Sequence, residues 1–128
     1  MSGETVTIKG ADGSFTGYLS KPAGGTGPGI VVIQEIFGVN KVMRDLTDAY
    51  AAAGYVALCP DLFWRIEPGI DITDQTDAEW KQAFDIFGKF DVDKGASHIA
   101  ATIKPLRPMT SRPAPYTPLT TPTTTLCT

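Results

Sequence analysis

Polar side chains follow a short apolar run in this sequence, and they are the first candidates for chemistry. Ile30 to Ile33 reads IVVI, and the segment QEIFG, residues 34–38, follows it directly. In an open α/β sheet, functional groups gather at the carboxyl ends of the parallel strands. We therefore interpret Glu35 as an active-site carboxylate, against the alternative that it caps a turn on the surface.

Histidine and cysteine, the usual partners in nucleophilic catalysis, are scarce. His98 is the sole histidine, and helical spacing places it off the expected apolar stripe, so we expect a solvated helix residue. Cys59 ends an apolar run and is expected to be a buried, inert thiol, whereas Cys127 is expected to be exposed. Neither G-x-C-x-G nor G-x-S-x-G occurs, and the nearest match, residues 95–99, lies within a predicted helix.

Metal and nucleotide sites are not indicated by the remaining polar residues. Four acidic residues gather near the start of a predicted helix, where carboxylates are favoured, and metal binding is the alternative reading. They are Asp71, Asp74, Asp77 and Glu79. The loop glycines lack the G-x-G-x-x-G spacing of a dinucleotide site. The sequence therefore predicts no metal and no cofactor.

Hydrophobic patterning predicts the elements that must position Glu35. Two alternating segments around a turn predict a hairpin, and two continuous apolar runs flanking a helix predict a buried, parallel βαβ unit. The predicted strands are Thr5–Lys9, Phe15–Ser20, Ile30–Ile33 and Tyr55–Cys59, with a helix from about Asn40 to Ala53. The expected fold class is α/β.

Two further helices are predicted after the last strand. One spans Thr76–Gly88, with Thr76 and Glu79 as a capping box, and the other begins near Asp91 or Asp93 and ends before Pro105. We expect each helix to pack an apolar stripe on the sheet. The stripes are Val42, Met43, Leu46, Ala49, Tyr50 and Ala53; Trp80, Ala83, Phe84 and Phe87; and Val92, Ala96, Ile99 and Ile103.

Composition divides the chain into two regions. The 128 residues are 42% hydrophobic and 20% charged, as expected of one globular domain, but all 14 acidic residues precede Lys104. The last 24 residues contain six prolines and eight threonines. We expect a folded domain over residues 1–104 and a Pro/Thr-rich tail over residues 105–128. The tail is interpreted as disordered or as the product of a reading-frame change.

Charge and segment composition exclude several functions. The net charge of −3 argues against nucleic-acid binding, and no apolar run approaches the ~18 residues of a membrane span. The first residues do not resemble a signal peptide, and two cysteines make no disulfide framework. We expect a cytoplasmic protein.

Several motifs resemble the dienelactone hydrolase family, the carboxymethylenebutenolidase-like α/β-hydrolases. They are IVVIQEIFGVN at residues 30–40, GYVALCPDL at 54–62, DVDKG at 91–95 and IAATIK at 99–104. The resemblance covers roughly residues 3–104, and implies the N-terminal half of an α/β-hydrolase fold. Such enzymes hydrolyse lactones and other esters with a cysteine nucleophile in a G-x-C-x-G-G elbow, followed by Asp and His.

The resemblance implies roles for a few residues of this chain. Glu35 matches an acid that lies beside the nucleophile and helps to govern its ionisation, and Ile36 matches a residue whose backbone N–H contributes to the oxyanion hole. The family often carries an arginine that binds the substrate carboxylate, where this chain offers Trp80 and Lys81. Trp64 and Arg65 are further candidates for the pocket lining. A lysine cannot form arginine's bidentate contact, which argues against a preference for chlorocatechol-type dienelactones.

The family's nucleophile, Asp and His have no match in this sequence. We therefore expect no turnover from the chain alone, with a small lactone or ester as the ligand of the full-length family. The alternatives are a non-catalytic interaction protein that pairs with an intact homologue, or self-associates through an exposed sheet edge, and a flavodoxin-like nucleotide-binding module. The last lacks a phosphate loop.

Overall fold

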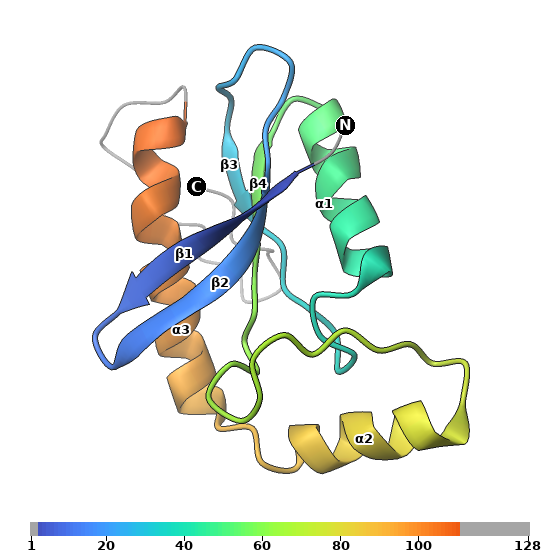
Figure 1. The fold of residues 1–128 in the computed structure, drawn as a ribbon. Coiled ribbons are helices and arrows are strands. Elements are labelled where there is room, and N and C mark those ends of the chain that lie inside the picture. Colours follow the sequence, from blue (N-terminus) through green and yellow to red (C-terminus); the bar gives the residue numbers. More distant parts are fainter. Residues whose placement is uncertain (1–2, 111–128) are drawn as a thin grey trace.

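A four-stranded sheet lies between two helices in the computed structural model of the chain, which describes residues 3–110 (Figure 1). Helix α1 lies on one face of the sheet and α3 on the other, while α2 lies beyond one end of the strands. The elements are β1 (Glu4–Gly10), β2 (Gly13–Ser20), β3 (Gly29–Val31), α1 (Lys41–Ala52), β4 (Val56–Pro60), α2 (Asp77–Phe87), α3 (Val92–Leu106) and the 3₁₀ turn η1 (Arg107–Met109).

The sheet has the order β1-β2-β4-β3 and mixes both strand directions. The β1–β2 hairpin is confirmed, and β2 continues the antiparallel pairing onto β4. Strands β3 and β4, which precede and follow α1 in the sequence, pair directly in parallel. Gly29 lies opposite Val56, and Val31 lies opposite Leu58. The predicted βαβ unit is therefore confirmed, although β3 ends at Val31 and Ile33 is 38% exposed.

The two apolar cores follow from the alternation of side chains along the strands. Val56 and Leu58 of β4 pack on the α3 side, in a cluster that includes Leu106. Ala57 and Cys59 face the other way, toward Met43 of α1. Burial of β4 on both faces explains why its sequence is continuously apolar and does not alternate with polar residues.

Each helix begins at a side-chain cap that the sequence marks. Asn40, Thr76 and Asp91 accept hydrogen bonds from the backbone N–H groups three residues further on. At the end of α1, Gly54 takes a φ of 106°, a conformation that favours glycine at this position. The Glu79 carboxylate departs from the reciprocal capping box, since it accepts from the backbone N–H of Thr73.

The buried faces of the helices differ from the predicted stripes. In α1, Val42 and Leu46 are 65% and 42% exposed, and the buried side chains are Met43, Thr47 and Ala51. In α2, Trp80, Phe84 and Phe87 are all exposed, and only Ala83 and Ile86 are buried. The reason is tertiary: α2 lies beyond the strand ends, and Ile86 packs on Phe63 and Ile70 of the preceding segment instead of on the sheet.

The end of α3 was expected at Lys104, and this expectation is wrong. The helix continues through Pro105 to Leu106, and η1 follows it directly as far as Met109. Proline removes one backbone donor, but full burial of Leu106 in the core on the α3 face stabilises the last turn. The expected tail beyond Thr110 lies outside the described residues.

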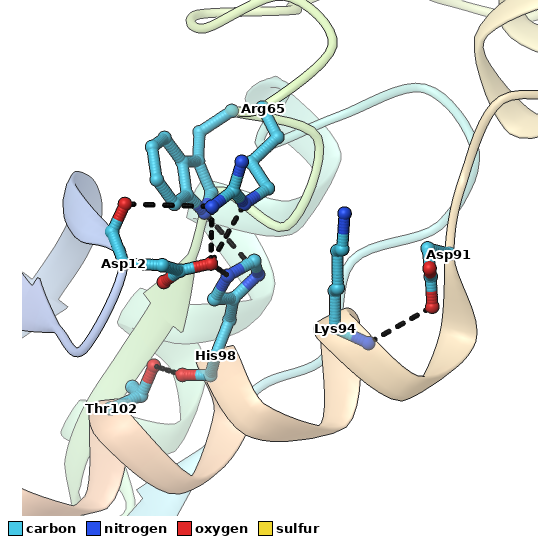
Figure 2. Close-up of polar contacts among 7 residues, drawn as sticks. Asp12, Arg65, Asp91, Lys94, His98 and Thr102 are labelled. Atoms are coloured by element: carbon cyan, nitrogen blue, oxygen red, sulfur yellow. Dashed lines mark hydrogen bonds and ion pairs between the residues drawn. The ribbon is translucent and has the colours of Figure 1, made fainter.

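His98 is buried, which corrects the expectation of a solvated side chain. It is 2% exposed, and Trp64 Nε1 donates to its Nδ1 at 3.3 Å. Its Nε2 lies 3.4 Å from Asp12 Oδ2, which also accepts from Arg65 Nε at 2.8 Å (Figure 2). We call these four residues, Asp12, Trp64, Arg65 and His98, the polar latch.

The polar latch joins three segments that are distant in sequence. Asp12 lies in the β1–β2 turn, Trp64 and Arg65 follow β4, and His98 comes from α3 (Figure 2). The Arg65 hydrogen bond is the main cause that lowers the pKa of the Asp12 carboxyl. Phe15 stacks on Trp64 with ring centroids 5.4 Å apart, so the latch also carries apolar packing.

We predict that His98→Ala lowers the free energy of unfolding by about 2–4 kcal/mol, because it opens a cavity and leaves the N–H of the half-buried Trp64 without its acceptor. Urea unfolding followed by circular dichroism measures the loss. The control is Lys94→Ala, an exposed position on the same helix, with an expected change within about 0.5 kcal/mol. Equal effects of the two substitutions would contradict a stabilising role for the latch.

Candidate functional site

A cavity of about 260 Å³ lies at the carboxyl ends of β3 and β4. Residues that follow these two strands form one wall, and the end of α2 with the first turns of α3 forms the other. The lining residues are Ile33, Gln34, Glu35, Ile36, Leu62, Phe63, Phe87, Phe90, Val92, Gly95, Ala96 and Ile99. The cavity is thus where parallel strands place chemistry, and its walls are mostly apolar.

Gln34 joins the ends of the two parallel strands. Its Oε1 accepts a hydrogen bond from the Leu62 backbone N–H at 2.7 Å, and its Nε2 donates to the Glu35 carbonyl at 3.1 Å. The side chain therefore fixes the segment after β3 against the segment after β4. Sequence reasoning gave Gln34 no role, although a polar residue directly after a buried strand was the available signal.

A tight turn places Glu35 and Ile36 in the cavity. The Gly38 N–H donates to the Glu35 carbonyl at 3.3 Å, and Gly38 has a φ of 82°. A Cβ on Gly38 would lie 2.0 Å from the Ile70 carbonyl oxygen, so glycine is required here on both grounds. The Phe37 carbonyl accepts from Ile72 N at 3.1 Å, which fastens the turn to the segment before α2.

Two groups of this turn have unused hydrogen-bonding capacity. Glu35 is exposed at the cavity, and its carboxylate receives no hydrogen bond from residues 3–110. The Ile36 backbone N–H likewise finds no acceptor within the same residues. A free backbone N–H beside a carboxylate, in an apolar cavity, is suited to hold an oxygen on which negative charge develops.

The other predicted pocket residues lie elsewhere. Trp80 packs edge-on against Phe37, with ring centroids 5.1 Å apart, and its Nε1 donates to the Asp74 carbonyl at 2.8 Å. Lys81 is exposed, and neither residue lines the cavity. Arg65 and Trp64 belong to the polar latch. Of the predicted apolar stripe of α2, Phe87 alone lines the cavity.

The acidic residues around the start of α2 have separate partners. Asp71 Oδ2 accepts from Arg44 Nη1 at 2.9 Å. Hydrogen bonds from the backbone and hydroxyl of Thr73 and from the Thr76 hydroxyl lower the pKa of Glu79. Within residues 3–110, no group of three or more His, Cys, Asp or Glu side chains could hold a metal ion. No helix there is long and apolar enough to cross a membrane.

Cys59 is not available as a nucleophile in this fold. Its side chain is fully buried within β4, and burial raises the pKa of its thiol to about 12. The reactive form of cysteine is the thiolate, which this environment disfavours. The prediction of a buried thiol at this position is confirmed.

These features define part of an α/β-hydrolase fold: a parallel βαβ unit with a cavity at its carboxyl ends, lined by a residue whose backbone N–H has no acceptor within residues 3–110. Comparison with known proteins agrees. The model of the dienelactone hydrolase family matches residues 15–113, and the chain belongs to this family.

Individual proteins of this family are similar to the chain in sequence. A carboxymethylenebutenolidase homologue of Azospirillum brasilense is 64% identical over 86 residues, which are 66% of this chain and 37% of that protein. The carboxymethylenebutenolidase of Pseudomonas sp. strain P51 is 38% identical over 101 residues, covering 79% of this chain and 42% of that one. The chain thus spans about two fifths of the length of these curated relatives.

A solved structure supports the same fold. The crystal structure of a dienelactone hydrolase homologue from Klebsiella pneumoniae aligns with a TM-score of 0.65 and 25% identity. The alignment covers 80% of this chain and 42% of that one.

We predict that Cys59 does not react with a disulfide reagent such as DTNB in the native protein at about pH 8, because its thiolate is scarcely populated there. The variant Cys127→Ser leaves Cys59 as the only thiol. Absorbance should report no released thiolate under native conditions and full reaction after unfolding in guanidinium chloride. Rapid reaction in the native state would show that the thiol is accessible and must be reconsidered as a nucleophile.

Proposed function

We propose that this chain forms the oxyanion-binding half of an active site that hydrolyses lactones or other esters. The observation that carries the proposal is the turn after β3, which places Glu35 and Ile36 at one apolar cavity; the Ile36 N–H has no acceptor within residues 3–110. A cytoplasmic location, expected from the sequence, belongs to the same proposal.

Each group has a distinct chemical role in the proposed reaction. When a nucleophile attacks the ester carbonyl, negative charge develops on the carbonyl oxygen, and the Ile36 N–H donates a hydrogen bond to it. Such a donor is most effective when it is fixed in advance and shielded from water. The Glu35 carboxylate accepts the proton of a neighbouring thiol, which generates the thiolate that attacks.

We expect the nucleophile to come from a segment of the family domain to which none of these 128 residues corresponds. The sequence contains no G-x-C-x-G or G-x-S-x-G elbow, Cys59 is buried, and His98 is held in the polar latch outside the cavity. We propose that the catalytic Cys, Asp and His belong to the part of the family domain that this chain does not span. On this basis the chain alone hydrolyses neither dienelactone nor 4-nitrophenyl acetate.

The test is a chimaera in which residues 1–110 of this chain replace the matching part of the Azospirillum brasilense relative. We expect the chimaera to hydrolyse 4-nitrophenyl acetate with a thiol-dependent burst, whereas the 128-residue chain should show no reaction. In the chimaera, Ile36→Pro should lower kcat by roughly 10²–10³-fold, because proline removes one oxyanion donor.

Ile36→Ala is the matched control, since a backbone donor is independent of the side chain, and it should retain most of kcat. Circular dichroism of both variants separates loss of the donor from loss of the fold. Equal activity of the proline and alanine variants would contradict the role of the Ile36 N–H. Turnover by the unmodified chain would contradict its dependence on the remaining segment.

The alternative proposal is an interaction protein that pairs with an intact homologue or with itself through the sheet. It rests on β3, which is the last strand in the sheet order and wholly apolar, although its three residues are buried in this structure. Light scattering coupled to size-exclusion chromatography tests it, alone and with the full-length relative. A monomer at all concentrations that does not bind the relative would reject this alternative.

A further inference from the structure

The contacts of His98 in the polar latch fit one protonation state of its ring. The indole N–H of Trp64 can only donate, so the nitrogen that it meets at 3.3 Å, Nδ1 of His98, is an acceptor and carries no proton. The single proton of the neutral ring is therefore on Nε2, which faces Asp12 Oδ2 at 3.4 Å (Figure 2). The neutral ring thus accepts from one neighbour and donates to the other.

The charges of the polar latch balance while His98 is neutral. Asp12 Oδ2 accepts from Arg65 Nε at 2.8 Å, and the same oxygen faces Nε2 of His98. One carboxylate is therefore already paired with one guanidinium group. A proton on His98 would place a second positive charge on the same carboxylate, on a side chain that is 2% exposed. Burial of such an additional charge is unfavourable.

The surroundings of His98 come from three neighbouring segments and from its own helix. The hairpin turn contributes Asp12 and the loop after β4 contributes Arg65, which are the charged groups on the ring side (Figure 2). Strand β2 contributes Phe15, whose ring centroid lies 5.3 Å from that of His98. On α3, Lys94 is exposed one turn earlier, and Thr102 Oγ1 donates to the backbone carbonyl of His98 at 2.7 Å.

A proton on Nδ1 would break the hydrogen bond between Trp64 and His98. Both facing nitrogens would then carry hydrogens, and two donors cannot form a hydrogen bond with one another. The other contact would persist, because the charged ring still donates from Nε2 to Asp12. Protonation therefore changes the partners of His98: the ring keeps the hairpin turn and loses the loop after β4.

The Trp64–His98 hydrogen bond also joins the two walls of the cavity beside Glu35. Phe63 lines the cavity from the loop after β4 and directly precedes Trp64. Ile99 lines it from α3 and directly follows His98. The hydrogen bond thus fastens the segment that forms one wall to the helix that contributes to the other wall.

We propose that the polar latch is a pH-sensitive contact: acidification protonates His98, releases Trp64 from α3 and loosens the loop after β4 on that helix. At higher pH the neutral ring holds the loop against the helix. The inference goes beyond the proposed hydrolysis and does not depend on it, because Trp64 and His98 lie outside the cavity lining. It implies that the two walls of the cavity are held together more firmly while His98 is neutral.

NMR of the 128-residue chain tests this inference, because His98 is the sole histidine and the chain has two tryptophans. Long-range ¹H–¹⁵N spectra report which ring nitrogen carries the proton, and Trp80→Phe assigns the indole signal of Trp64. At about pH 8 we expect a proton on Nε2 alone. On acidification toward about pH 5, the ring signals of His98 and the indole N–H signal of Trp64 should change with one midpoint.

Backbone amides give a second readout in the same spectra. The amides of Phe63 and Ile99, which lie next to the two partners of the hydrogen bond, should shift with the midpoint of His98. The amide of Ala51 is the internal control, because α1 lies on the other face of the sheet (Figure 1). Its signal should not follow that midpoint.

His98→Gln removes the titration and keeps both contacts, since the amide oxygen can accept from Trp64 and the amide nitrogen can donate to Asp12. In this variant the indole signal of Trp64 should stay constant over the same pH range. Ser97→Gln is the matched control. It introduces the same residue at the adjacent, exposed position and should leave the transition of the Trp64 signal in place.

Each outcome decides the inference. A proton on Nδ1 at about pH 8 would overturn it, as would a Trp64 signal that stays constant while the His98 ring titrates. A ring that stays neutral until the chain unfolds would also overturn it, because the native latch would not then respond to pH. An unchanged transition in His98→Gln would assign the effect to another group. If that variant does not fold, the midpoints of the two rings in the unmodified chain still decide.

Discussion

The parallel pairing of β3 with β4 is the constraint on which the rest of this structure depends. At the end of this ladder, the Val32 N–H donates to the Leu58 carbonyl at 2.9 Å. The segments that follow β3 and β4 then leave the sheet at the same end of the strands. The Gln34–Leu62 hydrogen bond fixes the two exits to one another. A shift in register would move Glu35 and Ile36 relative to the wall formed after β4, and the cavity would lose its shape.

Two ion pairs join segments of the fold that are distant in sequence. Arg65 is used to fasten the hairpin turn to the loop after β4, and Arg44 fastens α1 to the segment before α2. Neither arginine lines the cavity beside Glu35.

Helix α2 leaves several aromatic side chains exposed in this structure. This helix lies beyond the strand ends, with Trp80, Phe84 and Phe87 exposed, and its last turn contributes Phe87 to the cavity. Its aromatic spacing resembles that of a helix buried on a sheet, yet the sheet is already covered by α1 and α3. The family relatives are more than twice as long as the matched region, and an active site of this family is proposed to need residues from their remaining part.

The sequence by itself determined the features that are local in the chain. The caps at Asn40, Thr76 and Asp91, the hairpin, the βαβ unit and the carboxylate after β3 follow from short patterns, because each depends on neighbouring residues. Tertiary structure alone decided the burial of His98 and the continuation of α3 through Pro105. His98 is buried because Asp12 and Trp64, distant in sequence, satisfy its ring nitrogens, and Leu106 is buried because the sheet core receives it. No periodic pattern encodes such partners, since they meet only when the chain has folded.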